Sequence, residues 1–270
     1  MAPVRSLKTG LFKGTMLVGN TKYAPLMSVE YLIIGGGAGG VTNYGGGGAG
    51  QVTNTTADFK LGIAHTVTIG AGGAGDTSST DGINSSITAS NFTTVTGGKG
   101  FKQTGASFTA AGTSGNGFTG GNGLNASNPY LGGGGGGASA NGVAAAGTTG
   151  GAGGAGVSNS ITGSSVTYGG GGGGGAEGNG TRGVGGSGGG GNGWDPVSAG
   201  SAGTENTGGG GGGGKGTSVS GAGGSGYLVL KYLTADATLT IGAGLTGSIA
   251  TSGSYKIATI TAGTGTVSFA

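Results

Sequence analysis

The sequence has no cysteine and a single histidine, His65, among its 270 residues. The absence of cysteine excludes a disulfide framework and zinc sites built on thiolate ligands. Only 7% of the residues are charged and 6% are aromatic. No stretch approaches the roughly 18 consecutive apolar residues of a membrane-spanning helix, and the first residues contain no long apolar run of the kind found in secretory signal peptides. The composition therefore predicts a chain without disulfides and without membrane insertion.

Side chains able to carry out catalysis are few. The eight acidic residues are scattered, and no two share a spacing on an apolar face that would shift their pKa values apart. His65 lies in the alternating pattern HTVTIG, which favours a structural role. Asp76 and Asp81 flank a turn-like stretch but lack the ligand spacing of a calcium loop. We predict that the chain is not an enzyme and holds neither a cofactor nor a metal ion.

Two glycine motifs resemble nucleotide-binding signatures but lack the surrounding pattern. Residues 35–40, GGGAGG, follow an apolar run and satisfy G-x-G-x-x-G. A dinucleotide-binding motif would open a helix at this point, whereas VTNYGGGG follows here and has no helical pattern. The stretch from Gly209 to Lys215 fits G-x-x-x-x-G-K, but Gly216 stands where a phosphate-binding loop has Ser or Thr. We interpret both as chance matches in glycine-rich sequence.

Glycine is what the chain has in excess, with 80 residues, many in uninterrupted runs. The longest runs are 132–137, 169–175 and 208–214. A helix of such sequence is disfavoured by about 1 kcal/mol per Gly, and a strand of glycine has no side chains to pack across neighbouring strands. The remaining regular conformation is a left-handed extended helix with three residues per turn. Several such helices can hydrogen-bond side by side, which predicts a polyglycine-II sandwich with a core of backbone groups.

Two short apolar runs bracket the glycine-rich region. Residues 29–34, VEYLII, and residues 226–233, GYLVLKYL, are rich in residues that favour strands, and both are bounded by glycine. Neither strand would be stable alone, so we expect them to pair. The predicted fold class is mainly β and irregular: a polyglycine-II helix sandwich closed by paired β-strands, plus a small C-terminal β unit. The predicted domains are an N-terminal attachment segment, a glycine-rich domain and that C-terminal unit, at 1–28, 29–233 and 234–270.

The C-terminal unit contains four short strand-like segments: 237–244, 247–253, 254–263 and 264–270. A unit of about 35 residues is too small to be stable alone, which favours oligomerisation. We expect a homotrimer.

The N-terminal segment is basic. Its four basic residues precede the first acid, Glu30, so the first 28 residues carry +4 while the remainder carries −1 of the net +3. We predict that they attach the chain to an acidic face of a partner protein, although a solvated arm fits the pattern as well. Four charges over this length are too sparse to indicate nucleic-acid binding. The candidate attachment residues are Arg5, Lys8, Lys13 and Lys22.

Isolated large side chains occur in the loops between the glycine runs. Trp194 is the only tryptophan, and Asp195 follows it; Tyr130 stands two residues after Asn128. Amphipathic rings beside Asn and Asp suit stacking on a sugar or contact with a receptor loop. The alternative, that these residues pack the ends of the glycine segments, stays open. The candidate binding residues are Asn128, Tyr130, Tyr168, Trp194 and Asp195.

The order of these blocks resembles the glycine-rich domains of bacteriophage tail-fibre and other virion proteins, and the polyglycine-sandwich adhesins at the tips of some fibres. VEYLIIGGGAGG, HTVTIGAGGAG, islands of six or more glycines and GGSGYLVLKY follow one another over residues 29–233. The resemblance implies a rigid glycine core whose loops, here those around Tyr130, Tyr168 and Trp194, bind the host surface. The segment after residue 233 departs from that layout.

From this resemblance we expect a virion structural protein of the tail-fibre or adhesin type. Its expected partners are other virion proteins, through residues 1–28, and a host-surface glycan or outer-membrane protein. A purely structural capsid or tail decoration protein without receptor binding is the alternative. An ice-binding glycine bundle would need a flat, regular face, against which the irregular loops argue.

Overall fold

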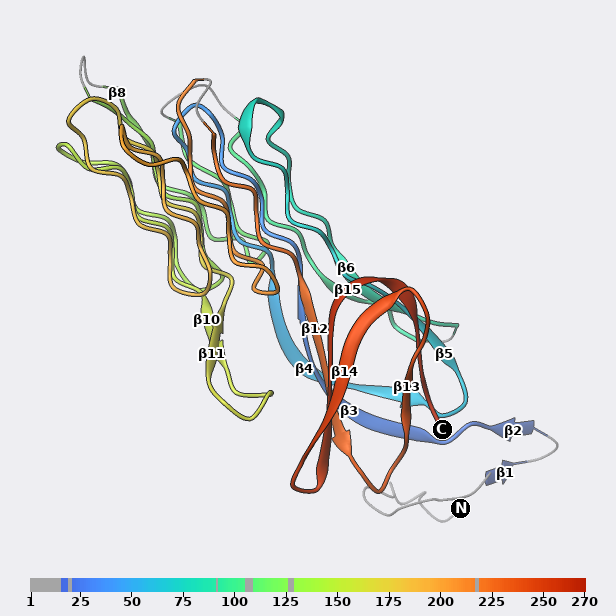
Figure 1. The fold of residues 1–270 in the computed structure, drawn as a ribbon. Coiled ribbons are helices and arrows are strands. Elements are labelled where there is room, and N and C mark those ends of the chain that lie inside the picture. Colours follow the sequence, from blue (N-terminus) through green and yellow to red (C-terminus); the bar gives the residue numbers. More distant parts are fainter. Residues whose placement is uncertain (1–15, 19–20, 91, 105–108, 126–128, 217–218) are drawn as a thin grey trace, which may run out of the picture.

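The computed structural model describes residues 16–18, 21–90, 92–104, 109–125, 129–216 and 219–270. Within these ranges the protein is mainly β, with fifteen strands, one turn of 3-10 helix and no α-helix. The molecule is elongated: a curved sheet forms one end, and the glycine-rich segments extend side by side away from it (Figure 1).

A nine-stranded antiparallel sheet forms the base of the molecule. Its strands follow the order β4-β3-β12-β15-β5-β6-β7, and β13 and β14 also pair with β15. The sheet curls until it is nearly closed (Figure 1). The bounds are β3 (Leu26–Ile34), β4 (Val52–Lys60), β5 (Ala64–Thr68), β6 (Ser85–Thr88), β7 (Val95–Gly97), β12 (Tyr227–Leu233), β13 (Leu239–Ile241), β14 (Leu245–Ser252) and β15 (Tyr255–Phe269).

The pairing of the two apolar runs that bracket the glycine region is confirmed. Strand β3 is antiparallel to β12, with Leu32 opposite Val229 and Ile34 opposite Tyr227. Both strands continue directly into glycine segments, at Gly35 and from Gly226. The sheet therefore holds both ends of the glycine region together.

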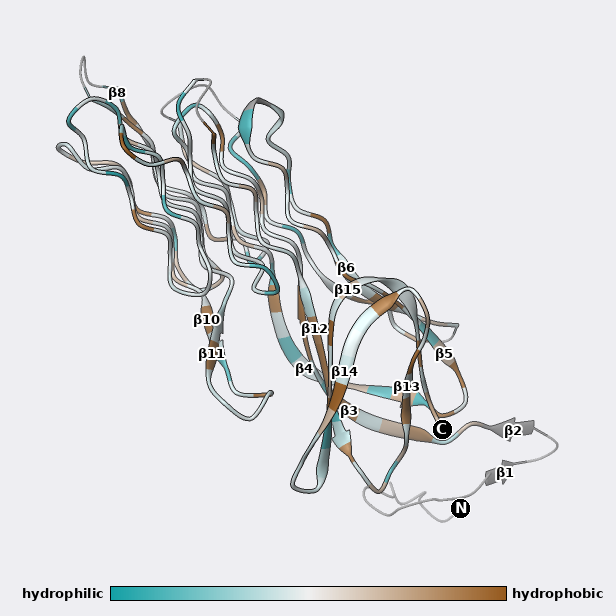
Figure 2. Ribbon diagram, in the orientation of Figure 1, coloured by the Kyte–Doolittle hydropathy of each residue, from teal (hydrophilic) through white to brown (hydrophobic). Residues whose placement is uncertain are grey.

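Each face of this sheet has its own apolar core. Because side chains alternate along a strand, Val29, Tyr31 and Ile33 point to the concave face and pack with Phe59 and other buried side chains. Leu32 and Ile34 point to the opposite face. Figure 2 shows hydrophobic residues gathered on these strands, whereas the glycine segments are mostly pale. An ordinary side-chain core thus stabilises only one end of the molecule.

The glycine segments are held by backbone hydrogen bonds to several neighbours. Gly36, Gly37 and Ala38 donate to three different segments, at Ile83, Gly224 and Gly48, over 2.9–3.0 Å. The partner segments then repeat, since Gly39 donates to Thr80 and Gly40 to Gly221. The run 170–175 follows the same rule, because Gly170 and Gly173 share one neighbouring segment while Gly171 and Gly174 share another. The choice of partner therefore has a period of three residues.

The C-terminal segment differs from the four short strands expected for it. It forms three strands, and residues 254–263 and 264–270 join in the single strand β15. The first part of β15 pairs with β12 and β14, and its last part pairs with β5 and β13. Gly263, with φ of +98°, lies between the two parts and lets the chain bend there without ending the strand. The segment therefore finds its strand partners within the chain itself. The predicted domain boundaries stay predictions.

Three short hairpins lie outside the main sheet. The pair β10 (Val157–Asn159) and β11 (Val166–Tyr168) covers the convex face, where Tyr168 stacks on Tyr227 with ring centroids 6.0 Å apart. The others are β1 (Met16–Val18) with β2 (Thr21–Tyr23), and β8 (Leu124–Asn125) with β9 (Tyr130–Leu131). The 3-10 turn η1 spans Asp76–Ser78.

His65 has the structural position that its sequence pattern predicts. It lies on β5 with 1% of its surface exposed. Its ring centroid is 4.7 Å from that of Phe59 and 5.1 Å from that of Phe92. Burial lowers the pKa of His65 below its ordinary value of 6.5. The folded protein therefore favours the neutral imidazole.

Lowering the pH from about 7.5 to about 5.5 should destabilise the protein through His65. The unfolded chain protonates this histidine below about pH 6.5, whereas the folded state resists protonation, so stability is complete above that pH and falls below it. The urea midpoint measured at both pH values tests this. In a His65→Phe variant the difference between the two urea midpoints should largely disappear. If the midpoint of the variant falls as far as that of the wild type, His65 is not the cause of the pH dependence.

Candidate functional site

Bulky residues at the ends of several glycine runs come together at the end of the molecule away from the sheet. Tyr44 and Tyr130 precede glycine runs, whereas Glu177 and Lys215 follow others. The runs that two of them precede start at this end, and the runs that the other two follow finish there, so the four residues meet. Backbone bonds fix them there: Gly175 donates to the Tyr44 carbonyl at 2.7 Å, and Glu177 donates to the Tyr130 carbonyl at 2.9 Å.

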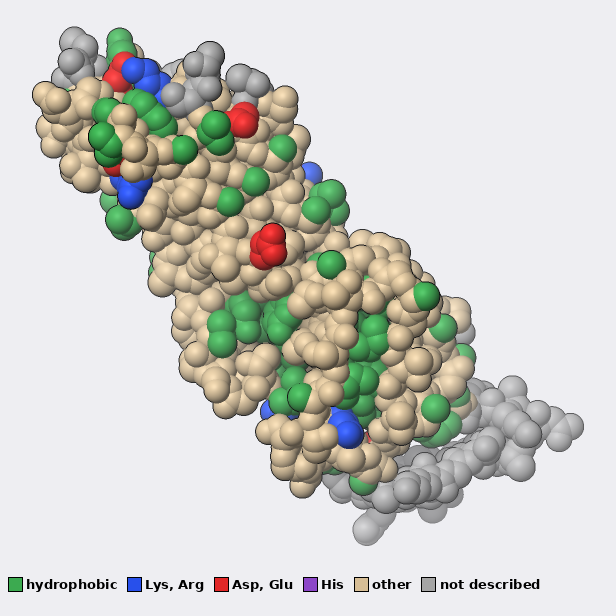
Figure 3. All heavy atoms as spheres, viewed as in Figure 1, with side chains coloured by type: hydrophobic (Ala, Val, Ile, Leu, Met, Phe, Trp, Pro, Cys, Tyr) green, Lys and Arg blue, Asp and Glu red, His purple; other side chains and the backbone are tan. Residues whose placement is uncertain are grey.

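A shallow cavity of about 580 Å³ opens at this end. Tyr130 is 36% exposed, and Trp194 is half-buried. Figure 3 shows acidic and basic side chains beside hydrophobic ones at this end of the molecule. The lining residues are Tyr130, Glu177, Gly178, Asn179, Trp194, Pro196 and Lys215.

A small polar network joins the charged and aromatic residues of this cavity. The Lys215 ammonium pairs with Glu177 Oε1 and lies 5.5 Å from the centre of the Trp194 ring, at cation–π distance. The Tyr44 hydroxyl donates to Glu177 Oε2 at 3.0 Å. The hydrogen bond from Lys215, and next that from Tyr44, lower the pKa of Glu177 despite its partial burial. Burial first, and then Glu177, raise the pKa of Tyr44.

The chemistry of the cavity is that of a binding surface. The aromatic rings of Tyr130 and Trp194 offer apolar faces, while Glu177 and Lys215 offer a carboxylate acceptor and an ammonium donor. The carboxylate stays charged at neutral pH because its pKa is lowered. Such a surface suits a ligand with both an apolar face and polar groups.

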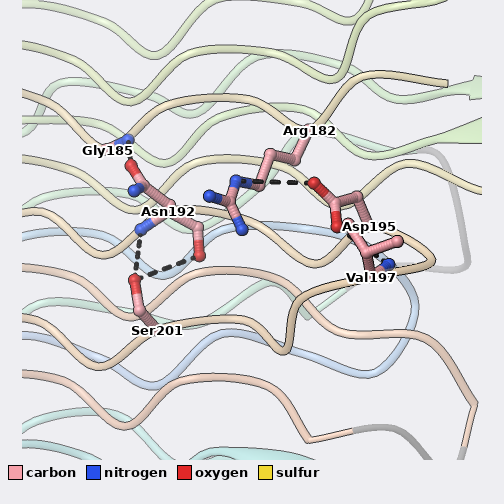
Figure 4. A network of polar contacts seen from close by, with 6 residues as sticks. All are labelled: Arg182, Gly185, Asn192, Asp195, Val197 and Ser201. Atoms are coloured by element: carbon pink, nitrogen blue, oxygen red, sulfur yellow. Dashed lines mark hydrogen bonds and ion pairs between the residues drawn. The ribbon is translucent and has the colours of Figure 1, made fainter.

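Asp195 supports the loop that follows Trp194. Its Oδ2 lies 3.6 Å from Arg182 Nε, and its Oδ1 accepts a hydrogen bond from the Val197 amide at 3.1 Å. In Figure 4 the Arg182 side chain points toward Asp195, and Asn192 lies beside them, bonded to Gly185 and Ser201. The structure thus places Asp195 next to the cavity as a residue that holds the turn.

The other candidate residues do not join this cluster. Tyr168 is 4% exposed and lies in the convex-face core, so its ring is buried at the other end of the glycine segments. Asn128 lies outside the described residues. The attachment candidates Arg5, Lys8 and Lys13 also lie outside them, and Lys22 is in β2.

Sequence reasoning missed Tyr44, Glu177 and Lys215. Lys215 appeared only as part of a chance nucleotide-binding match. What these three residues share in the sequence is their position: each is the first large polar residue before or after a glycine run. A residue that precedes a run starting at one end and a residue that follows a run finishing at that end must lie close together, but the sequence does not give the direction of each run.

The two nucleotide-like motifs hold no phosphate cradle. All six N–H groups of residues 35–40 donate to carbonyls of other segments, and so do those of residues 210–214. A phosphate-binding loop needs such groups free to face the ligand. Neither motif therefore offers the anion-binding geometry that its sequence suggests.

The described ranges contain neither a metal-binding cluster nor a membrane-spanning helix. No cluster of three or more His, Cys, Asp or Glu residues could hold a metal ion there. No helix in the described parts of the chain is long and apolar enough to cross a membrane.

The glycine region with its closing strands matches a known family. A model described as "Glycine-rich domain" covers residues 15–233 of the 270. The chain belongs to this glycine-rich domain family. Comparisons with curated proteins and with solved structures found no match. The match to the glycine-rich domain ends with β12, so β13, β14 and β15 lie beyond it.

Proposed function

We propose that this glycine-rich domain protein is a bacteriophage virion structural protein of the tail-fibre or adhesin type. In this proposal a polyglycine-II sandwich forms a rigid scaffold, and its end loops bind the host surface. The observation that carries the proposal is the placement of one aromatic and charged cavity at the free end of the backbone-bonded glycine segments.

The three-residue period of the backbone bonds supports the polyglycine-II conformation. In a helix with three residues per turn, successive N–H groups point in three directions, so each can bond to a different neighbour. The close spacing supports it too: a Cβ added at Gly172 would lie 2.0 Å from the Gly211 carbonyl oxygen, and one at Gly174 would lie 2.1 Å from that of Gly132. Such packing stiffens the scaffold without an apolar core.

The composition of the cavity supports host-surface binding. Sugars present apolar ring faces and hydroxyl groups, which match the rings of Tyr130 and Trp194 and the polar groups of Glu177 and Lys215. An exposed loop of an outer-membrane protein has similar chemistry. We therefore propose a host glycan or an outer-membrane protein as the ligand, bound without chemical conversion.

The remaining parts of the proposal concern assembly. Residues 1–28 attach the protein to other virion proteins, and the chain forms a homotrimer, in keeping with the symmetry of fibres. The mass of the purified protein in solution tests the trimer.

Substitution at the cavity should weaken attachment to cells. Labelled protein is incubated with a panel of bacterial strains, and bound fluorescence is measured. Trp194→Ala and Tyr130→Ala should each reduce binding at least about tenfold, because central aromatic residues commonly contribute 2 kcal/mol or more.

Tyr255→Ala is the matched control. Tyr255 is 42% exposed and lies on β15 in the sheet, so its loss should leave cell binding unchanged. If the wild-type protein binds no strain, or if the cavity variants bind as well as wild type, the adhesin proposal fails. The purely structural capsid or tail protein would then be favoured.

A further inference from the structure

The nearly closed sheet has a seam between β4 and β7, the two ends of its strand order. The two edges meet next to the glycine segments, where the Gln51 amide donates to the Gly98 carbonyl at 2.7 Å and the Gly98 amide donates to Gln51 Oε1 at 2.9 Å. Beyond this point no strand pairing joins β4 to β7 in the described residues. The seam is therefore closed at one end and open toward Lys60.

The outer edge of β4 presents free backbone groups along this seam. Gly35 bonds to the Gln51 carbonyl and Leu61 bonds to the Pro25 carbonyl, so the odd-numbered residues of β4 bond to β3. Because the bonds of an antiparallel pair alternate, the even-numbered residues point their N–H and C=O groups outward. The Asn116 side chain bonds both outward groups of Val52. From there on, no described residue pairs with the outward groups of Asn54, Thr56, Asp58 and Lys60.

A cavity of about 540 Å³ lies along this edge. Its apolar lining comes from both sides of the seam, with Tyr31 and Ala57 on one side and Phe92 and Val95 on the other. Leu26, at the start of β3, adds a side chain that is 61% exposed. Threonines of β4 and of residues 93–96 form the polar rim. Free backbone groups and an apolar lining thus occur in one place.

We propose that this seam binds a single extended peptide segment of a partner protein, which adds a strand to β4. Strand addition to a free edge takes its affinity from backbone hydrogen bonds and its specificity from alternate side chains. Here every second side chain of the peptide would face Tyr31 and Phe92, and should therefore be apolar. Residues 92–96 bound the opposite side of the cavity, and a second folded copy would bring its β3 along with its β4 edge. An isolated strand brings no such neighbour, so it is the occupant that we infer.

The test uses the full-length protein and a labelled nine-residue peptide of alternating threonine and valine, with a lysine at each end. Fluorescence anisotropy should show saturable binding. Amide hydrogen exchange should slow at least about tenfold at residues 54, 56 and 58 when the peptide is bound, and should change little at 53, 55 and 57, which already bond to β3. No saturable binding, or binding without this alternating protection, overturns the proposal.

Two substitutions at one position provide a second test. Thr56→Pro removes one outward N–H and no bond to β3, and edge strands tolerate proline, so peptide binding should weaken at least about tenfold. Thr56→Val keeps the N–H and should bind as wild type. Unchanged urea midpoints would show that both variants fold. Equal binding by Thr56→Pro and wild type overturns the proposal; if Thr56→Pro does not fold, the exchange pattern of the wild type decides.

Discussion

Gly172→Ala should destabilise the protein by more than about 3 kcal/mol or prevent folding. The added Cβ would lie 2.0 Å from the carbonyl oxygen of Gly211 and 2.6 Å from its carbonyl carbon, in the middle of the backbone-bonded segments. No side chain can move aside, because the obstacle is backbone. Gly172 also donates to Gly47 at 2.9 Å, so separating the segments would break this bond and its neighbours. Urea unfolding followed by Trp194 fluorescence measures the loss.

Gly175→Ala is the matched control within the same run. A Cβ there would meet the Gly213 carbonyl oxygen at 3.2 Å, a contact that a shift of a few tenths of an ångström relieves. Alanine also lowers the entropy of the unfolded chain, which offsets part of the cost. We expect a change of no more than about 1 kcal/mol. Equal effects at both positions would mean that close backbone packing does not determine stability here.

Local sequence patterns were enough to predict the two strands that bracket the glycine region. The runs VEYLII and GYLVLKYL are rich in residues that favour strands, and their position at the two ends of the glycine region implied that they pair, as β3 and β12 do. The pattern around His65 likewise indicated a buried strand position. In each case a few neighbouring residues are enough to identify the strand itself.

The other long-range partners could not be predicted in this way. The sequence predicted one strand segment that ends at Gly263 and another that begins at residue 264, and glycine usually weakens strands. In the structure four different strands pair with β15 along its length and carry it across Gly263. The cavity shows the same limit: Trp194 and Tyr130 stood out as isolated aromatic residues, but their meeting with Glu177 depends on the directions of separate glycine runs.

Deleting residues 255–270 should unfold the whole protein. This deletion removes β15, which joins β12 to β5 and contributes Ile260, Val267 and Phe269 to the concave-face core. Because β3 and β12 continue into the glycine segments, loss of the sheet should also release those segments. Trp194 is the only tryptophan and lies at their far end, so its fluorescence reports on a part of the molecule that the deletion does not touch.

Two point substitutions also test whether the sheet and the glycine segments unfold together, without removing a strand. Phe269 is fully buried, and Phe269→Ala should lower the free energy of unfolding by about 3–5 kcal/mol. Ile249, on β14, is 39% exposed, and Ile249→Ala should cost less than about 1 kcal/mol. If Trp194 fluorescence reports the wild-type urea midpoint in both Phe269→Ala and the deletion, the C-terminal residues form the separate unit that the sequence predicts. If the unfolding transitions followed by Trp194 fluorescence and by far-ultraviolet circular dichroism shift together, the sheet and the glycine segments unfold together. Strand pairing at the base then determines whether the loops at the far end stay in place.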